Sequence, residues 1–589
     1  MNAHRTRSKI VGSKHSLVGL LLWGMLVPVL LSGCTPEEEV SGIVLISIDT
    51  LRADHLGCYG YSRETSPFLD QLAASGARFE QAISPSSWTL PSHASMLTGL
   101  YPSSHRAVDA ASSIGPSALT VAELLQGEGF ATGAVVTSWF VSANYGFDRG
   151  FDWFQDLDQT AHEKAGKTVD ATEVIDLAEE WLAARADQRF FLFLHLYDTH
   201  YTYNPPPPYR ELFATDYKGP RRKYRRYKYY KRNPPTAERL AFEMSMYDGE
   251  IRYVDAQLAR LYGILDRLGL QENTLIIVTS DHGEEFGERG SWGHGHTLFE
   301  EQVHVPLLVA GPGIEGPQTI AAQVGLVDLP PTLLELAGLS PPEGLHGRSL
   351  APLLRGQVAD SRTAAADGRP ALLETSRFDT NLIGLRRRGW KLLLDLGTGR
   401  ESLFDLSTDP GEKQNLASDR TDIAARLRTE TMSAVEALVP DRWNLAWLDE
   451  SAGKLVGELE TSGVFLEPTL DAGAGTVRVS EDLHKMTFHL SPNETLRWKT
   501  LPVDAGITFA GTPVSNGSAV PLLIGEAGEP VQIFPHDVSI RVASATEAAR
   551  RPELAAAHLW IESQQDASES VDMRRADRRR LKALGYIVD

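Results

Sequence analysis

Three nearly continuous apolar runs stand out in the first half of the chain, and polar residues follow each of them closely, with Asp198 and His200 coming after the second. The runs are residues 43–48, 190–196 and 274–279. Apolar runs of this length are typical of strands that are buried on both faces of a parallel sheet. Asp49 directly follows the first run, and Asp281 comes two residues after the third. Because open α/β sheets bind ligands at the carboxyl ends of their strands, these carboxylates are predicted to share one site.

Helical periodicity fills the intervals between the apolar runs. It is found at residues 66–75, 118–127, 169–186 and 236–268. Strands that alternate with helices predict an α/β fold with three layers, in which helices cover both faces of the sheet. We assign residues 42–345 to this catalytic core.

The pattern changes after about residue 450 to short alternating runs separated by Gly, Pro, Asn and Asp. Such runs occur at residues 455–465, 476–479, 486–490 and 538–542. They predict a β-rich appended domain. Its expected range is 446–565, with a C-terminal subdomain of the core before it at 346–445 and a final helix after it at 566–589.

The N-terminus predicts export. Basic residues precede an apolar run at 17–31, which ends in Leu31-Ser32-Gly33-Cys34. We interpret residues 1–33 as a secretion signal and Cys34 as the acylated cysteine of a bacterial lipobox, with residues 34–41 as a tether. An uncleaved membrane span is the alternative, although the run is short for one. Either way, the body of the protein is expected outside the cytoplasm, in a bacterial cell envelope.

Cysteine content and charge narrow the remaining possibilities. Cys58 is the only cysteine besides Cys34, so a disulfide framework is excluded. The 57 basic and 77 acidic residues give a net charge of -20, which makes nucleic acid an unfavourable partner. The segment at residues 221–232 departs from this trend, since it is basic and aromatic. It is either a solvated loop or a lid that attracts an anionic substrate.

Candidate chemistry begins with the residues at the strand ends. Asp49, Asp281 and His282 offer the oxygen and nitrogen ligands that hold divalent cations. Residues 88–99 (WTLPSHASMLTG) form a hydroxyl-rich turn that leads into an expected helix. A helix N-terminus there would offer backbone donors to an oxyanion, while an ordinary N-capped helix is the alternative.

Taken in order, these segments resemble the sulfatase family of the alkaline phosphatase superfamily. The resemblance covers about residues 41–417. Its motifs are residues 49–54 (DTLRAD), 89–99 (TLPSHASMLTG), 280–284 (SDHGE), 300–306 (EEQVHVP) and 403–412 (LFDLSTDPGE). The resemblance implies a metal-dependent ester hydrolase with an anionic substrate. It further implies that Asp49, Thr89, Asp281 and His282 bind the metal, with Thr89 as the nucleophile. Thr50 stands where many relatives carry a further Asp ligand.

The chain also departs from the family pattern at its chemical centre. Sulfatases oxidise a Cys or Ser to formylglycine in a Cys/Ser-x-Pro-Ser-Arg signature, whereas this chain reads Thr89-Leu90-Pro91-Ser92-His93. The methyl group on the β-carbon of Thr prevents aldehyde formation, so no formylglycine is expected. His93 replaces the Arg of the signature. The Lys and His expected after residues 129–132 (GFAT) are missing, and residues 293–296 (GHGH) replace another Lys. Three cationic contacts to sulfate are therefore absent.

A second metal ion is one way to restore the missing positive charge. Superfamily members that use Thr or Ser directly on phosphate esters pair an Asp/Thr/Asp/His site with an Asp/His/His site. Asp198, His200, His294 and His296 fit that inventory. We therefore expect one divalent ion (Zn, Ca or Mn) and consider a second, with Asp198 and His296 among its ligands.

Direct contact with the substrate is the alternative role for these histidines. His200 and His294 would then act as hydrogen-bond donors or general acids. His93 is a further catalytic candidate, although packing is the simpler role for it and for His304.

Four functions follow from this inventory. Hydrolysis of a phosphate mono- or diester comes first, and hydrolysis of a sulfate ester by unmodified Thr89 comes second. A transferase of phosphoethanolamine or glycerophosphate is a third possibility, but relatives of that kind usually carry several membrane spans. A non-catalytic envelope binding protein is the fourth, and the intact ligand set argues against it.

Overall fold

The computed structural model describes residues 40–157, 169–219, 232–357, 369–378 and 380–439. It also describes the C-terminal stretches 441–447, 454–461, 464–470, 475–480, 483–491, 494–501, 507–514, 531–533 and 557–563. The predicted signal, Cys34, nearly all of the basic and aromatic segment, the run at 538–542 and the final helix lie outside these residues. Those assignments remain predictions.

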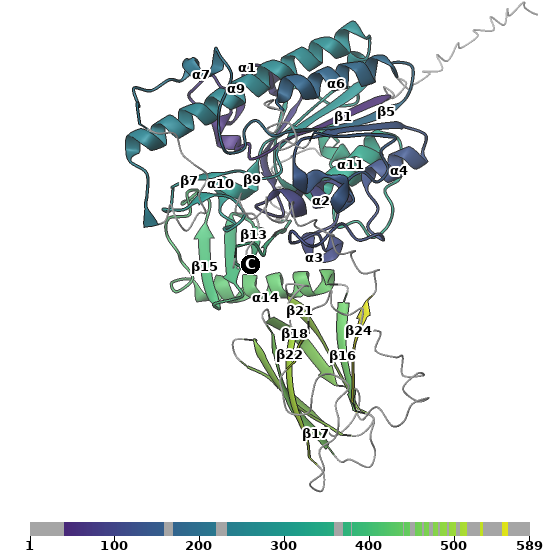
Figure 1. Ribbon diagram of the computed structural model, residues 1–589, viewed down its shortest axis with the longest axis vertical. Coiled ribbons are helices and arrows are strands. Elements are labelled where there is room, and N and C mark those ends of the chain that lie inside the picture. Colours follow the sequence, from purple (N-terminus) through teal and green to yellow (C-terminus); the bar gives the residue numbers. More distant parts are fainter. Residues whose placement is uncertain are drawn as a thin grey trace, which may run out of the picture. The chain divides into compact units, whose positions relative to one another are not determined.

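A mixed central sheet forms the middle layer of the core (Figure 1). The strand order is β11-β2-β10-β6-β1-β5-β3-β4, with β9 paired to β2. Their bounds are β1 (Gly42–Ile48), β2 (Ala77–Ile83), β3 (Ala131–Val136), β4 (Trp153–Asp156), β5 (Phe190–Leu196), β6 (Thr274–Thr279), β9 (His304–Val305), β10 (Leu307–Ala310) and β11 (Gln318–Gly325).

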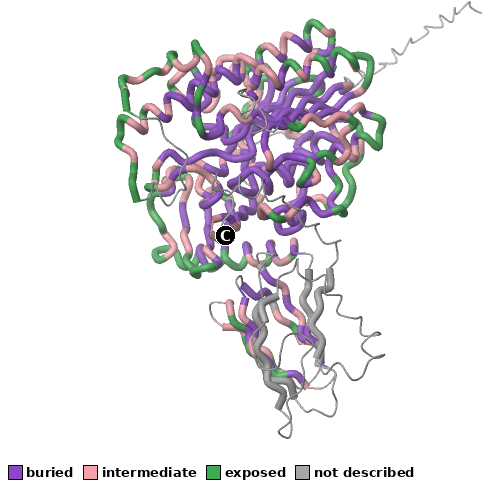
Figure 2. Tube along the Cα trace, in the orientation of Figure 1, coloured by how far each residue is buried: buried purple, intermediate pink, exposed green. Residues whose placement is uncertain are grey.

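The three apolar runs form adjacent parallel strands, as predicted. Strand β1 lies between β5 and β6 and runs parallel to both, so that Ile46 pairs with Leu194 on one side and Val278 on the other. Every residue of the three strands is buried (Figure 2). Burial on both faces explains why their sequences do not alternate. Because the strands are parallel, their carboxyl ends meet at one edge of the sheet.

Helices cover both faces of the sheet and complete the three layers. On one face, α1 (Pro67–Ser75), α6 (Ala171–Ala183) and α9 (Ala237–Arg267) contribute to one apolar cluster. On the other face, α2 (Thr89–Thr98), α4 (Val121–Gly127) and α11 (Leu329–Leu336) contribute to a second. The predicted three-layer α/β fold is confirmed.

One helix begins later than its periodicity suggested. Helix α4 starts at Val121 rather than at residue 118 because Thr120 forms a capping box. The Thr120 hydroxyl accepts a hydrogen bond from the backbone N–H of Glu123, and Glu123 accepts one from the backbone N–H of Thr120. The cap fixes the first turn of the helix.

The C-terminal subdomain consists of a four-stranded antiparallel sheet and one helix. The strands follow the order β12 (Ala371–Thr375), β13 (Leu382–Arg387), β14 (Trp390–Asp395) and β15 (Arg400–Asp405), and the helix is α14 (Thr421–Leu438). Apolar residues of β13, β14 and α14 share one cluster.

The appended part contains two antiparallel sheets, which agrees with the expected β-rich character. One has the order β18-β21-β16-β24 and the other β19-β20-β17-β22-β23. Their bounds are β16 (Asp441–Trp447), β17 (Lys454–Thr461), β18 (Val464–Leu470), β19 (Thr476–Val479), β20 (Lys485–Leu490), β21 (Thr495–Leu501), β22 (Ile507–Val514), β23 (Val531–Ile533) and β24 (Ala557–Ser563). Because β16 pairs with β21 and β24, this part begins nearer residue 441 than 446.

Among the described residues, no helix combines the length and the apolar character needed to cross a membrane.

A buried lysine joins the four-stranded sheet to the core. The Lys391 Nζ on β14 lies 3.0 Å from a carboxylate oxygen of Glu300 and 3.0 Å from one of Glu412. Glu300 opens the short helix α10 (Glu300–Val303) of the core, and the Lys391 side chain is fully buried.

We expect Lys391→Met to lower the free energy of unfolding by about 3–5 kcal/mol, because the buried Glu412 would lose its cation and Glu300, which also pairs with Arg386 at 3.2 Å, would lose one. The matched control is Arg428→Met. Arg428 pairs with Glu401, but its side chain is 47% exposed, so the cost there should stay below about 1 kcal/mol. Urea denaturation of both variants measures the difference, and equal losses would contradict a joining role for Lys391.

Candidate metal and catalytic site

Three side chains converge at the edge where β1 and β6 end. Asp49 follows β1, and Asp281 and His282 follow β6. One ligand atom from each lies within 4.8 Å of the other two, and all three residues are buried. The His282 Nε2 lies 3.3 Å from the Asp281 Oδ2 and 3.8 Å from the Asp49 Oδ1. The predicted strand-end ligands therefore form one cluster.

Backbone hydrogen bonds orient two of these ligands. The Asp281 Oδ1 accepts from the backbone N–H of Thr50 at 3.2 Å and of His282 at 2.9 Å. Its other oxygen is thereby directed into the cluster. The His282 Nδ1 donates to the carbonyl oxygen of Gly283 at 2.9 Å. Its Nε2 consequently keeps a lone pair for a cation.

The electrostatics of the cluster fit a divalent cation. Burial raises the pKa of Asp49, and Glu284 raises it further. Burial and then Asp49 raise the pKa of Asp281. Within the described structure, both Asp49 oxygens and the Asp281 Oδ2 are buried without a hydrogen-bond partner. Two neighbouring buried carboxylates are unfavourable unless a cation compensates them. Two carboxylates and an imidazole are suitable ligands for such an ion.

Thr89 lies beside this cluster, at the first position of α2. Its hydroxyl is 3.4 Å from the His282 Nε2, and the residue is 3% exposed. Ser92, one turn later, donates from its hydroxyl to the carbonyl oxygen of Asp281 at 2.7 Å. This hydrogen bond fixes the start of α2 against the metal-ligand loop. The structure thus brings together Asp49, Thr89, Asp281 and His282.

Thr50 has a different role from the Asp that many relatives carry there. Its hydroxyl donates to the carbonyl oxygen of Thr199 at 2.7 Å, so it is occupied by the loop after β5. Its φ of 58° is unusual for a β-branched residue. The Tyr247 hydroxyl of α9 donates to the Thr50 carbonyl at 2.8 Å and holds this turn in place.

His200 and His294 lie next to the metal ligands. The ring centroid of His294 is 4.4 Å from that of His282 and 5.0 Å from that of His200. The His294 Nδ1 is 3.4 Å from the Glu284 Oε1. The carboxylate of Glu284 therefore lies beside the His294 ring. Glu284 was not among the site residues predicted from the sequence, although its place in the SDHGE motif was a usable signal.

The hydrogen bonds of His200 limit what it can do. Its Nδ1 donates to the carbonyl oxygen of Tyr201 at 2.8 Å, and the Tyr197 hydroxyl lies 3.3 Å from its Nε2. Burial lowers its pKa to about 3, so the ring is neutral near pH 7. In this tautomer the Nε2 accepts a proton rather than donates one.

Asp198 does not join the site. Its Oδ1 accepts a hydrogen bond from the backbone N–H of Ala171 at the start of α6, at 3.0 Å. Burial raises its pKa to about 7, with a further contribution from Asp170. The residue that the sequence suggested as a metal ligand is instead engaged at a helix N-terminus.

His296 is also directed elsewhere. Its Nε2 contacts the Ser291 hydroxyl at 2.5 Å and lies 3.3 Å from a carboxylate oxygen of Glu285. Glu285 begins the strand β7 (Glu285–Phe286), which pairs with β8 (Trp292–Gly293). Among the described residues, the group of converging ligand atoms consists of Asp49, Asp281 and His282. The predicted second metal set that includes Asp198 and His296 is therefore not assembled.

His93 is buried behind Thr89. Its Nδ1 donates to the carbonyl oxygen of Thr89 at 2.9 Å, and its Nε2 lies 2.9 Å from the Ser47 hydroxyl. Burial lowers its pKa, so it is neutral. These contacts agree with packing and positioning rather than with contact to a substrate.

His195 was missed because it lies inside the apolar run of β5. Its Nε2 is 3.4 Å from the Asp49 Oδ2, and its Nδ1 is 3.0 Å from the Thr137 hydroxyl. Thr137 belongs to the region where the family carries its catalytic Lys and His. A histidine on the neighbouring strand thus lies beside the metal ligand.

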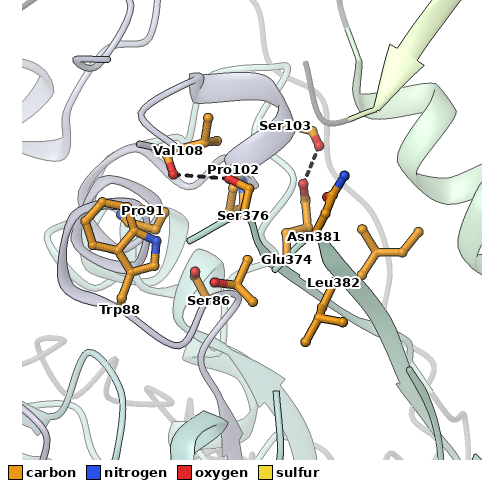
Figure 3. A pocket seen from close by; sticks show the side chains of 12 residues that line it. Ser86, Trp88, Pro91, Pro102, Ser103, Val108, Glu374, Ser376, Asn381 and Leu382 are labelled. Carbon is orange, nitrogen blue, oxygen red and sulfur yellow. Dashed lines mark hydrogen bonds between the residues drawn. The ribbon is translucent and has the colours of Figure 1, made fainter. Parts of the chain in front are cut away.

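A small pocket adjoins the start of α2 (Figure 3). It lies between α2, α3 (Pro102–His105) and strands β12 and β13. Trp88, which precedes Thr89, forms part of its wall. The Ser103 hydroxyl donates to the carboxylate of Glu374 across it.

Comparison with protein-family profiles shows to which family the chain belongs. The sulfatase family profile matches residues 41–339, half of the chain. The chain belongs to the sulfatase family. A second profile, the C-terminal region of N-sulphoglucosamine sulphohydrolase, matches residues 287–437. Enzymes of this family hydrolyse esters and use a divalent metal, for which Asp49, Asp281 and His282 form a suitable site.

Individual relatives of this sulfatase-family chain include several sulfatases. Arylsulfatase K of Bos taurus is 26% identical over 424 residues, which cover 63% of this chain and 77% of the relative. The N-acetylglucosamine-6-O-sulfatase of Bacteroides thetaiotaomicron is 25% identical and is covered to 89%, with 69% of this chain aligned. Arylsulfatase K of Mus musculus is 34% identical, but the alignment covers 31% of this chain and only 34% of the relative.

Solved structures support the fold. The phosphonate monoester hydrolase of Agrobacterium radiobacter superposes with a TM-score of 0.56 at 22% identity, covering 67% of this chain and 95% of the other. A structure solved with its substrate D-glucosamine-2-N,6-O-disulfate gives a TM-score of 0.55 at 22% identity, covering 67% and 97%. At this identity the likeness concerns the fold alone.

Removal of the metal should destabilise the protein, because Asp49 and Asp281 would repel one another. We expect a chelator to lower the Tm of wild-type protein. Asp49→Asn should be more stable than chelator-treated wild type and should gain nothing from added metal, because it lacks one of the two buried charges. Asp176→Asn on the exposed side of α6 is the control and should respond to metal as wild type does. Thermal unfolding with and without chelator measures these effects, and an unchanged wild-type Tm would contradict the metal site.

Proposed function

We propose that this sulfatase-family hydrolase cleaves phosphate mono- or diesters, with the Thr89 hydroxyl as its nucleophile. The observation that carries the proposal is the position of that hydroxyl, 3.4 Å from the His282 Nε2 at the start of α2. This is the position in the signature where sulfatases form their aldehyde. Thr89 cannot be oxidised in that way, so it acts as a hydroxyl.

A divalent cation held by Asp49, Asp281 and His282 would supply Lewis acidity, lowering the pKa of the Thr89 hydroxyl. Thr89 gives its proton to solvent water, and its Oγ1 forms a bond to phosphorus while the bond from phosphorus to the ester oxygen breaks. The leaving oxygen takes a proton from protonated His294, the proposed donor, for which the Glu284 carboxylate 3.4 Å from its Nδ1 is the counter-charge. Water then forms a bond to phosphorus and gives one proton back to His294. The bond from phosphorus to the Thr89 Oγ1 breaks, Oγ1 takes a proton from solvent, and phosphate or a phosphate monoester is released.

Sulfate ester hydrolysis by the unmodified Thr89 is the second candidate. It is favoured by the relatives, several of which are sulfatases. The step that releases sulfate argues against this candidate. A sulfated formylglycine hydrate expels sulfate as the hemiacetal breaks down, and the Thr89 side chain has no second hydroxyl for that step.

The cellular place of the enzyme is part of the same proposal. Cys34 and the apolar run before it support export and a lipid anchor in a bacterial cell envelope. An anionic ester of the envelope or of the surrounding medium is therefore the proposed substrate.

The decisive experiment compares four substrates with the metal-loaded protein: an aryl phosphate, a bis-aryl phosphate, an aryl phosphonate monoester and an aryl sulfate. We expect kcat/KM to be highest for one of the two phosphate esters. Metal content is measured on the same preparation. If the aryl sulfate alone were hydrolysed, the phosphate assignment would be wrong.

Substitution of the nucleophile provides a separate prediction. Thr89→Ala should lower kcat by at least ~10³-fold, because no other hydroxyl replaces the attacking oxygen. Thr89→Ser keeps a hydroxyl and should retain measurable turnover. The matched control is Thr98→Ala at the other end of α2, where the hydroxyl donates to the carbonyl of Ala94. Wild-type turnover in Thr89→Ala would exclude Thr89 as the nucleophile.

A further inference from the structure

The proposed reaction leaves the site short of positive charge. Asp49, Asp281 and Glu284 place three carboxylates in or beside the metal cluster, and one divalent ion leaves one negative charge uncompensated. The sequence lacks the Arg and the two Lys that contact the anion in sulfatases. An anionic ester needs another cation in this site.

Arg377 brings a cation to the site from the C-terminal subdomain. It comes two residues after β12 and is 7% exposed. Its guanidinium carbon lies 4.3 Å from the ring centroid of Trp88 and 5.5 Å from that of Phe140. Trp88 directly precedes Thr89 in the chain. The guanidinium therefore stacks on the residue that leads into the nucleophile.

The glycine between His294 and His296 gives Arg377 a second contact with the site. Gly295 has a φ of +81°, and a β-carbon there would lie 3.1 Å from the Arg377 Cδ and 3.3 Å from the Trp88 Cβ. The Thr375 hydroxyl donates to the Gly295 carbonyl at 3.2 Å, which ties the end of β12 to this turn. Arg377 is thus packed between the residue before Thr89 and the residue after His294.

The charge of Arg377 also acts on residues of the site. Burial and Glu284 raise the pKa of Asp49, whereas Arg377 lowers it. Burial is the main cause of the low pKa of His200, and Arg377 contributes in the same direction. The charge of Arg377 is therefore felt at Asp49 and at His200.

We propose that Arg377 binds the non-bridging oxygens of the anionic group that Thr89 attacks. A guanidinium presents parallel N–H donors that match two oxygens of a phosphoryl group, and low exposure strengthens such bonds. The faces of Trp88 and Phe140 hold its plane in place. In this chain, Arg377 takes over the charge of the missing family cations. The inference rests on the proposed function, since it names the residue that binds the anionic group of the same substrate.

The test measures anion binding apart from turnover. Inorganic phosphate is titrated calorimetrically into metal-loaded wild type, Arg377→Ala and Arg377→Lys. We expect Arg377→Ala to bind phosphate at least ~10-fold more weakly, because a charge-assisted bidentate contact is lost. Arg377→Lys keeps the charge but not the paired donors, and its affinity should lie between the other two. Added guanidinium ion should restore part of the binding and of the phosphate ester turnover in Arg377→Ala.

Arg387→Ala is the matched control. Arg387 lies on β13 and pairs with Glu430 at 2.6 Å, with a side chain that is 30% exposed. Its removal should leave phosphate affinity unchanged. Equal phosphate affinity in wild type, Arg377→Ala and Arg377→Lys would overturn the inference even if phosphate esters were the substrates. If wild type hydrolysed aryl sulfate only, the proposed function would fail, while weaker anion binding by the Arg377 variants would still support the role of Arg377.

Discussion

Two carboxylates that are buried side by side set the conditions for the rest of this structure. Asp49 and Asp281 lie at the ends of β1 and β6, out of contact with water. Such a pair is stable only when a cation compensates it or when protons neutralise it. The surrounding residues favour the cation. Backbone N–H groups hold one oxygen of Asp281, and the Gly283 carbonyl fixes the ring of His282, so the remaining lone pairs converge.

The loop that carries Asp281 also determines where Thr89 lies. Ser92 connects the first turn of α2 to the carbonyl of Asp281, and Thr89 is carried to the cluster by that connection. A hydroxyl at this point can act as a nucleophile beside a Lewis acid without prior oxidation. Under the proposed function, the family scaffold supports a different chemistry because a threonine stands at its signature position.

Much of the fold could be predicted because burial leaves a clear pattern in the sequence. The strands β1, β5 and β6 are buried on both faces, and their sequences are nearly continuous apolar runs for that reason. Asp49 directly follows β1, and Asp281 comes two residues after β6, so their positions in the chain alone predicted that they lie together. Thr89 lies in a motif that resemblance could identify. These features depend on residues that are close in sequence or that lie on neighbouring strands of the sheet.

Other parts of the site depend on long-range packing and could not be inferred in this way. Asp198 has the right chemistry for a metal ligand, yet the start of α6 engages it. His296 is two residues from His294, but the turn directs it to Glu285. His195 was hidden in an apolar run, and Arg377 lies in a part of the chain without a motif. The paths of the loops decide which histidine faces Asp49 and Asp281. The hydrophobic periodicity of the sequence does not predict those paths.

The hydrogen bond from Thr375 to Gly295 joins the C-terminal subdomain to the core. The central sheet carries Asp49 and Asp281 after the ends of β1 and β6, whereas the segment after β12 carries Arg377, which packs against Trp88. If Arg377 binds the anion as proposed, changes in this subdomain alter how the anion is held while Asp49, Asp281 and His282 stay in place. Exchange of the subdomain between relatives would then test the anion contact separately from the strand ends that carry the two carboxylates.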